Sequence, residues 1–221
     1  MNSLSIVSCR SYVKYMSRLV NDLIRNGYLT SDNIIDAFSK IRRHQFVPSD
    51  LSAQSEANIA LPIGYGQTIS QPLTVAFMLE LLDPQAGQNI LDVGTGSGWT
   101  TALLAHIVGD AGSITALEVI PELCKIGESN VKKFSFIKKG VVQFHSQSGE
   151  NGFEKNAPYD RILVSAAATE IPAAFKQQLK DGGKMVIPVR NEIWFVEKKG
   201  TDDFNIEKFA GFVFVPFIEK K

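Results

Sequence analysis

Apolar residues recur with two different periods along this chain, and the change of period separates a helical beginning from an alternating remainder. Residues 10–25 carry apolar side chains at helical spacing, and Gly27 stops that run. A second helix is expected after Ser31 or Asp32, either of which can cap it. Its apolar positions are Ile34, Ile35, Phe38 and Ile41.

The stretch from 43 to 70 follows neither period and is expected to be a long irregular segment. Prolines and glycines interrupt it, yet it is too apolar for a disordered linker. Loops of this length inside a folded chain usually serve a function. Ser70 then looks like the N-cap of a helix that has Pro72 in its first turn, ends near Leu82 and is closed by Pro84.

From residue 89 onward, strand-like and helix-like runs alternate. The expected strands are 89–93, 113–117, 141–145, 160–165 and 184–189, and the expected helices are 97–108, 121–132 and 171–180. Two final runs, 192–197 and 209–216, have no helix between them and are expected to pair antiparallel. This order predicts an α/β, Rossmann-like fold with a mostly parallel sheet, antiparallel C-terminal strands and an N-terminal helical extension. We expect a single domain over 1–221, with the helices and covering loop in 1–70 and the α/β core in 71–221.

Composition narrows the class of protein. The chain has 221 residues, of which 44% are hydrophobic and 21% charged, as in ordinary globular proteins. Lysine plus arginine and aspartate plus glutamate number 23 each, and this balance argues against a general nucleic-acid binder. No apolar run approaches the roughly 18–20 residues that span a bilayer. Cys9 and Cys124 are not expected to form a bridge, so a reducing cytoplasm is expected, and the scattered His44, His106 and His145 give no metal site.

The strongest chemical signal is a glycine-rich loop at the end of the first buried strand. Residues 90–98 read Ile-Leu-Asp-Val-Gly-Thr-Gly-Ser-Gly, and Glu118 follows 20 residues after Gly98. Bare backbone near a ligand and a carboxylate for ribose hydroxyls are how α/β domains hold an adenosine. The spacing is one residue tighter than in the dinucleotide fingerprint, which favours S-adenosyl-L-methionine. A nicotinamide cofactor and a ligand-free turn remain as alternatives.

Asp92 lies inside the apolar strand that precedes the loop, where a buried carboxylate needs partners. The loop amides and a ligand ammonium could supply them, or Asp92 could cap the loop in a purely structural role. Trp99 is expected to pack at the start of its helix, with a position beside the cofactor as the alternative.

A longer motif is more specific than the glycine loop. Residues 61–72, Leu-Pro-Ile-Gly-Tyr-Gly-Gln-Thr-Ile-Ser-Gln-Pro, resemble the signature of the protein-L-isoaspartate (D-aspartate) O-methyltransferase family and stand, as in that family, just before the loop. Further matches follow in order at 157–160, 166–167, 171–172, 178–183, 187–189 and 214–216. The resemblance covers residues 44–217.

The resemblance implies a repair activity. The methyl group of S-adenosyl-L-methionine would pass to the carboxylate of an L-isoaspartyl residue in a damaged protein or peptide, leaving S-adenosyl-L-homocysteine. The methyl ester would then cyclise to a succinimide without the enzyme, and hydrolysis would return part of it to aspartate. A carboxylate is already ionised at neutral pH, so no general base is needed. We expect the protein to be a monomer and to have neither nucleic-acid nor membrane partners.

The resemblance also implies roles for individual residues. Ser70 takes the catalytic position, where its hydroxyl could donate to the acceptor carboxylate or shape the pocket, without acting as a nucleophile; plain N-capping is the alternative. The substrate would contact Pro62, Ile63, Phe214, Val215 and Pro216. The cofactor would contact Gln67, Thr68, Ile69, Ser70, Asp92, Gly94, Thr95, Gly96, Ser97, Gly98, Glu118, Ser148 and Gly149.

Three positions depart from the family pattern. Ala57, beside Glu56, stands where the family usually has aspartate; Ser148 replaces an aspartate expected near the adenine; and Arg190 replaces a glycine. The serine could still accept a hydrogen bond, at a loss of about 1 kcal/mol relative to a charged acceptor. These departures keep two alternatives open: a methyltransferase for another carboxylate or a small molecule, and a cofactor-binding protein with weak catalysis.

Overall fold

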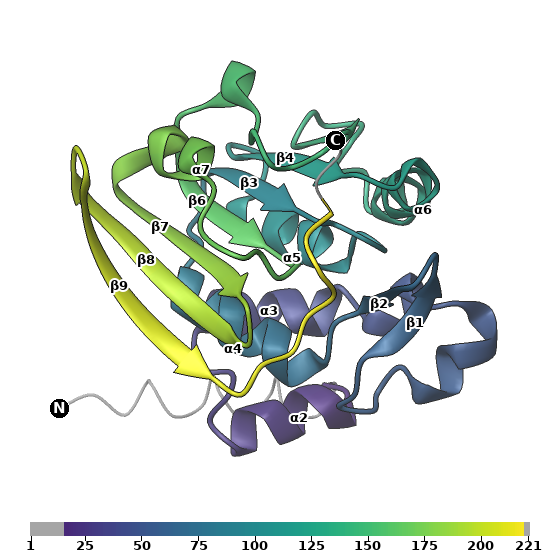
Figure 1. The fold of residues 1–221 in the computed structure, drawn as a ribbon. Coiled ribbons are helices and arrows are strands. Elements are labelled where there is room, and N and C mark those ends of the chain that lie inside the picture. The colour runs from purple at the N-terminus through teal and green to yellow at the C-terminus, as the bar shows by residue number, and fades with distance from the viewer. Residues whose placement is uncertain (1–15, 219–221) are drawn as a thin grey trace, which may run out of the picture.

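A computed structural model describes residues 16–218, which are built around one seven-stranded sheet (Figure 1). The strand order is β5-β4-β3-β6-β7-β8-β9; the pairs from β5 to β7 are parallel and the last two are antiparallel. The strands are β3 (Asn89–Val93), β4 (Ser113–Glu118), β5 (Val142–Ser146), β6 (Tyr159–Val164), β7 (Leu179–Val189), β8 (Glu192–Gly200) and β9 (Asp203–Ala210). This arrangement confirms the predicted fold class.

Helices lie on both faces of the sheet, and a small separate hairpin lies near the carboxyl end of β3. The α-helices are α2 (Arg18–Arg25), α3 (Asp32–Lys40), α4 (Pro72–Leu82), α5 (Trp99–Val108), α6 (Pro121–Lys132) and α7 (Ala173–Gln178). Short 3-10 helices are η2 (Arg43–Phe46), η3 (Ser49–Gln54) and η4 (Glu154–Asn156), and the hairpin consists of β1 (Leu61–Gly64) and β2 (Gln67–Ile69). None of the helices within 16–218 is long and apolar enough to cross a membrane.

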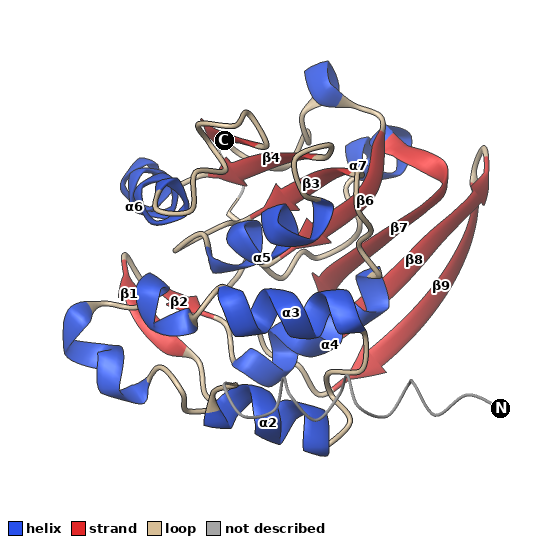
Figure 2. Cartoon of the chain, turned by 180° about the vertical axis from the view of Figure 1, so that it is seen from behind, coloured by secondary structure: helices blue, strands red, loops and turns tan. Residues whose placement is uncertain are grey.

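Successive residues of the sheet strands enter two different cores. In β3, Ile90 packs with the cluster that includes α2 to α6, whereas Leu91 packs with the cluster that includes Phe175 of α7. This is the period-2 alternation of a strand buried on both faces. Figure 2 views the molecule from the side opposite to Figure 1, and there α3, α4 and α5 lie between the viewer and the sheet.

The strand order reverses between β3 and β6. From β3 the chain runs outward through β4 and β5 and then returns to the other side of β3 as β6 and β7. In open α/β sheets, the crevice at the carboxyl ends of the strands at such a reversal is where ligands bind. The loops after β3, β4 and β6 therefore define where the site can form.

Several element predictions need correction. The segment 43–70 is not irregular throughout, since it contains two 3-10 helices and the β1–β2 hairpin. The last strand is β9 at Asp203–Ala210 rather than 209–216, because its side chains are mostly exposed and give no apolar alternation. Helix α7 is shorter than the expected 171–180, and β7 begins at Leu179. The part of the first expected helix at 10–15 lies outside the described residues, as does Cys9.

The two predicted caps also differ from the structure. Ser31 is the N-cap of α3, but its hydroxyl donates to Glu80 Oε2 at 2.7 Å and makes no capping bond. The N-cap of α4 is Gln71, so the N-capping role considered for Ser70 is wrong. Pro72 does occupy the first turn, as expected, and is the first residue of the helix, so that the N-cap lies one residue after Ser70.

Candidate active site

The glycine loop leaves β3 and is held by the neighbouring strand β4. The amides of Gly94 and Thr95 both donate to the Leu117 carbonyl, at 2.8 and 3.3 Å. Gly98 has a φ of +83°, and a Cβ there would lie 2.8 Å from the Gly127 carbonyl oxygen in α6. A larger residue would strain the backbone and push α6 away from the loop, so glycine is required for this close approach.

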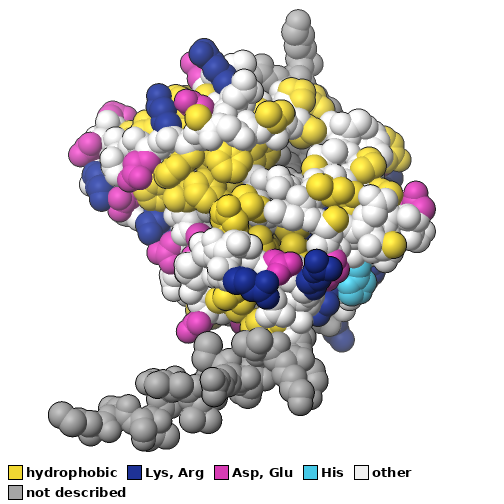
Figure 3. Space-filling view, turned by 90° about the horizontal axis from the view of Figure 1, so that it is seen from below, with side chains coloured by type: hydrophobic (Ala, Val, Ile, Leu, Met, Phe, Trp, Pro, Cys, Tyr) yellow, Lys and Arg dark blue, Asp and Glu magenta, His cyan; other side chains and the backbone are white. Residues whose placement is uncertain are grey.

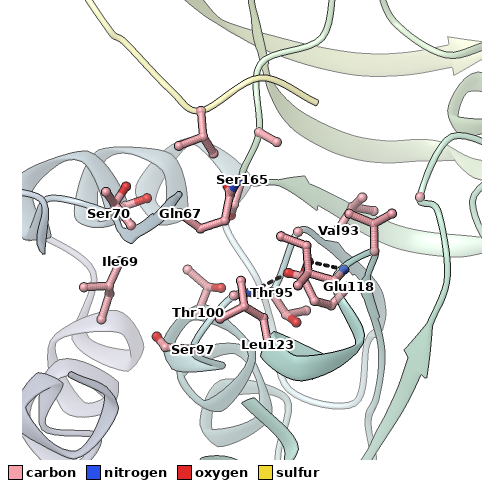
Figure 4. Close-up of a pocket in the computed structure, with 18 of the residues that line it drawn as sticks. Gln67, Ile69, Ser70, Val93, Thr95, Ser97, Thr100, Glu118, Leu123 and Ser165 are labelled. Carbon is pink, nitrogen blue, oxygen red and sulfur yellow. Dashed lines mark hydrogen bonds between the residues drawn. The ribbon is translucent and has the colours of Figure 1, made fainter. Parts of the chain in front are cut away.

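Glu118 closes the loop from the end of β4. Its Oε2 accepts from the Gly96 amide at 2.8 Å and its Oε1 accepts from the Ile120 amide at 3.0 Å (Figure 4). These two bonds fix the carboxylate at the pocket wall, and each oxygen keeps a further lone pair for a ligand. Glu118 thus has both the fixed position and the acceptor capacity that ribose hydroxyls require.

Asp92 lies beneath the loop and is completely buried. Its Oδ2 accepts from the Thr101 hydroxyl at 2.6 Å, while Oδ1 has no partner within residues 16–218. Burial raises the pKa of Asp92 to about 7. The expectation that loop amides bind this carboxylate is wrong, because those amides are taken by Leu117 and Glu118.

The β1–β2 hairpin brings the 61–72 motif over the glycine loop. A Cβ on Gly96 would lie 3.1 Å from Cδ1 of Ile63, which shows how closely the hairpin approaches. Ser70 follows β2 directly, and its hydroxyl makes no hydrogen bond within residues 16–218. Figure 4 shows Ser70 and Gln67 on one side of the pocket, with Thr95 and Glu118 on the other.

These elements border about 770 Å³ of space, part of it open to solvent. Twelve predicted site residues line it: Gln67, Thr68, Ile69, Ser70, Gly94, Thr95, Gly96, Ser97, Glu118, Gly149, Val215 and Pro216. Six other predicted residues do not line it: Asp92, Gly98, Ser148, Pro62, Ile63 and Phe214. Of these six, Asp92 lies buried beneath the glycine loop and Ile63 approaches the loop from the hairpin.

Ser148 points elsewhere than expected. Its hydroxyl accepts a long bond of 3.4 Å from the Glu150 amide, and it is the next residue, Gly149, that lines the pocket. A side chain at Gly149 would collide with Val93 on β3. The loop after β5 therefore contributes bare backbone to the pocket.

A second cleft adjoins the first one. It is lined by Ala60, Thr68, Ser70, Gln71, Leu73, Thr74, Ser165 and residues 211–215, and contains about 940 Å³, part of it open to solvent. Thr68, Ser70, Ser165 and Val215 line both clefts. Its lining has no ionisable side chain, and Val213 is 87% exposed. The underside of the molecule carries apolar side chains across its middle (Figure 3).

The C-terminal segment that borders both clefts is held by backbone bonds. The Ala167 amide donates to the Val215 carbonyl and the Phe217 amide donates to the Ala167 carbonyl, both at 2.8 Å. The Asn191 carbonyl accepts from Gly211 and Phe212, each at 3.3 Å. Between these anchors, the amides of Val213 and Phe214 make no hydrogen bond within residues 16–218.

Some lining residues were not predicted. They include Ser165 and Ala166 after β6, Phe217 and Ile218 near the C-terminus, and Thr100 and Leu123 at the starts of helices. Ser165 could have been found, because it follows the strand next to β3 at the point where the strand order reverses. Trp99 packs against Phe38 at the start of α5, as expected, and also borders the pocket, which was the alternative position.

The residues present suit S-adenosyl-L-methionine. The pocket combines a glycine floor that a Cβ would obstruct, the fixed carboxylate of Glu118, and the buried Thr95 Oγ1, which has no partner within residues 16–218. Among the described residues that line it there is no lysine or arginine, so these residues offer a phosphate no cationic partner. Within residues 16–218 no cluster of His, Cys, Asp or Glu could hold a metal ion.

All three departures from the family pattern, Ala57, Ser148 and Arg190, lie outside both clefts. The Ala57 carbonyl accepts from Arg43 Nη1 at 3.2 Å, and neighbouring Glu56 binds the Leu19 amide. Arg190 is exposed in the turn after β7, with a φ of +57°, and its amide donates to Ala168.

Comparison with known proteins agrees with this geometry. The sequence model of the Protein-L-isoaspartate(D-aspartate) O-methyltransferase family matches residues 14–221. A protein-L-isoaspartate O-methyltransferase of Methanopyrus kandleri is 43% identical over 91% of this chain and 90% of its own length, and one of Dictyoglomus thermophilum is 42% identical over 92% and 91%. A Plasmodium falciparum crystal structure described with the same activity, in complex with S-adenosyl-L-homocysteine, has a TM-score of 0.82 at 21% identity, covering 91% of this chain and 97% of that one.

Proposed function

This chain belongs to the protein-L-isoaspartate (D-aspartate) O-methyltransferase family, and we propose that its two adjoining clefts divide the reaction between cofactor and substrate. It is an S-adenosylmethionine-dependent enzyme that methylates the carboxylate of L-isoaspartyl residues. The first cleft takes the cofactor and the second takes the damaged peptide. The observation that supports this division is the position of Ser70, which lines both.

The floor of the first cleft holds the cofactor. Bare backbone at Gly94, Gly96 and Gly149 lets it approach closely, and Glu118 accepts from the ribose hydroxyls. When bound, S-adenosylmethionine supplies a methyl group that a carboxylate oxygen can accept, giving a methyl ester and S-adenosylhomocysteine. The apolar walls at Val93, Leu123 and Ile218 exclude water from the transfer.

Ser70 places the acceptor carboxylate at the junction of the clefts. Its hydroxyl, unpaired within residues 16–218, donates to one carboxylate oxygen and leaves the other directed at the methyl group. The carboxylate is ionised at neutral pH, so the reaction needs no general base, and neither cleft is lined by histidine or cysteine. Positioning of this kind can supply several kcal/mol, up to about 7–11 kcal/mol in ideal cases.

The second cleft receives the peptide around the isoaspartyl residue. The unpaired amides of Val213 and Phe214 offer backbone hydrogen bonds that any flanking sequence can satisfy. Contacts of this kind suit an enzyme that must accept many damaged sites. We propose no nucleic-acid partner, since the net charge is zero and the residues of 16–218 that line the two clefts include no basic side chain. It also keeps the monomer and the cytoplasmic setting expected from the sequence.

The test is methyl transfer to a defined peptide. Incubation with labelled S-adenosylmethionine and an isoaspartyl peptide should give a base-labile methyl ester, and the same peptide with normal aspartate is the control. Absence of label above that control, at saturating cofactor, would sink the proposal. Transfer to another carboxylate alone, or tight S-adenosylhomocysteine binding without turnover, would instead support one of the two alternative functions.

A further inference from the structure

A buried arginine lies between the two halves of the site. Arg43, at the start of η2, is only 3% exposed, and its side chain reaches the backbone of two segments that are distant in sequence. Within residues 16–218 it forms no ion pair with a carboxylate, although neighbouring Arg42 pairs with Glu56 at 3.4 Å. A buried cation without a counter-ion is costly unless other groups compensate for its lost hydration.

Backbone carbonyls compensate at both terminal nitrogens of Arg43, while its buried Nε has no partner within residues 16–218. Arg43 Nη1 donates to the carbonyls of Ser55 and Ala57, each at 3.2 Å. Nη2 donates to Ile59 at 2.8 Å and to Ser70 at 3.2 Å, with a longer contact of 3.5 Å to Ile69. One guanidinium therefore connects the 55–59 loop to the backbone of Ile69 and of Ser70, the catalytic position.

Arg43 also contacts the cofactor side of the site. Its guanidinium carbon lies 5.5 Å from the centre of the Trp99 ring, within the range of a cation–π interaction. Trp99 lines the first cleft at the start of α5, and its indole Nε1 donates to the Ile41 carbonyl at 3.2 Å. The guanidinium is thus in contact with the glycine-loop helix and with the Ser70 backbone at once.

We infer that Arg43 is a positioning residue for methyl transfer, which holds Ser70 in register with the cofactor through its carbonyl oxygen. This inference rests on the proposed role of Ser70. The planar fork of a guanidinium can donate to several carbonyls in fixed directions, whereas a lysine ammonium at the same position provides one point charge and fewer directed donors. Burial lowers the pKa of Arg43 to about 10, so the side chain remains charged at neutral pH.

The test compares Arg43→Lys and Arg43→Met with Arg42→Lys and Arg42→Met, the matched changes at the adjacent partly exposed arginine. Rates are divided by the fraction of protein that binds S-adenosylhomocysteine in calorimetry, so loss of folded protein is removed from the comparison. We expect kcat toward the isoaspartyl peptide to fall at least tenfold in both Arg43 variants. The dissociation constant for S-adenosylhomocysteine should stay within about threefold, because the floor of the first cleft is held by β4.

Two results would overturn the inference. One is a normalised kcat within twofold of the unmodified enzyme in the Arg43 variants. The other is a fall in kcat that the Arg42 variants reproduce. Wild-type activity is measured first, and its absence would mean that the proposed function fails. The positioning role is then judged from amide hydrogen exchange of residues 67–71. Exchange there should become faster in Arg43→Lys and not in Arg42→Lys.

Chemical rescue separates positioning from general stability, and it applies even to a poorly folded variant. Arg43→Ala leaves space for a free guanidinium ion beside the same carbonyls. Guanidinium at about 10–100 mM, enough to occupy a weak site, should raise the normalised kcat several-fold. Equal concentrations of sodium or urea should not raise it. Equal responses to all three additives would count against a specific role.

Discussion

The floor and the cover of the cofactor pocket are built in different ways. The floor comprises residues 93–98 and 117–120, which continue directly from adjacent parallel strands, and its bonds join neighbours in the sheet. The cover comprises residues within 61–72 and 211–218, which precede and follow the floor in the sequence. It is held by the Arg43 guanidinium and by a few backbone bonds to Ala167 and Asn191.

Because of this difference, substitutions in the floor and in the cover should affect different properties of the enzyme. The floor shares its hydrogen bonds with the sheet, so a change there should alter stability and cofactor affinity together. The cover can shift without disturbing the sheet, so a change there should alter turnover and peptide binding. Four predictions test that division.

The largest effect is expected in the floor at Gly98. Gly98→Ala would force an alanine into the positive φ of this position and place its Cβ against Gly127. Backbone strain and overpacking together should lower the free energy of unfolding by about 2–5 kcal/mol. Gly66→Ala in the cover is the matched control, since Gly66 also has positive φ but no atom lies within 4 Å of the added Cβ. Its loss should be about 1–2 kcal/mol. Urea unfolding measures both, and equal losses would contradict the proposed rigidity of the floor.

The second prediction concerns pH and Asp92. Burial raises the folded-state pKa of Asp92 from 3.8 to about 7, so the native state holds an extra proton between these values and its stability falls as the pH rises through them. Asp92→Asn removes this dependence. In the absence of cofactor, the free energy of unfolding of the variant minus that of the wild type should grow by about 1.4 kcal/mol per pH unit up to pH about 7.

The difference between the two proteins should level off above that pH. Chemical denaturation at intervals from pH 5 to pH 8 gives the curve, and subtraction removes the contributions of other titrating groups. A flat difference would show that Asp92 is charged in the folded protein throughout this range.

The third prediction concerns the cover at Ser70. Ser70→Ala removes one hydrogen bond to the ionised acceptor, worth about 1.5–3 kcal/mol, so kcat toward an isoaspartyl peptide should fall roughly 10- to 100-fold. Affinity for S-adenosylhomocysteine should remain unchanged. Ser70→Thr keeps a hydroxyl and should retain more activity than the alanine variant. A loss confined to cofactor affinity would place Ser70 with the floor instead.

The smallest effect is expected at the outer rim of the cover. Val213→Glu adds a negative charge to the second cleft and should raise the KM for an isoaspartyl peptide about two- to fivefold at low salt, with less effect at high salt. Val213→Lys should leave KM unchanged or lower it. Ile206→Glu on β9, away from both clefts, is the control for an added surface charge. Identical KM values for all three variants would argue against peptide binding in this cleft.

The accuracy of the sequence predictions follows the same division. Strand β3 and helix α6 were predicted at the residues where they occur, because each has a strong apolar period and clear end signals at the glycine loop and at Pro121. The β1–β2 hairpin was missed because its strands are short and half-exposed and pair only with each other. Strand β9 was misplaced because its exposed side chains give no periodic signal.

Local sequence therefore determined the α/β class, the glycine floor with Glu118, and the 61–72 motif that contains Ser70. These features depend on apolar period, on glycine at positive φ, and on residue types within one short segment. Only the tertiary structure decided that Ser70 joins two clefts, that Gly149 rather than Ser148 lines the pocket, and that Asp92 has one unpartnered oxygen. It alone also brought Arg43 to the Ser70 carbonyl across 27 residues, because such a contact depends on how distant segments pack, which no local pattern records.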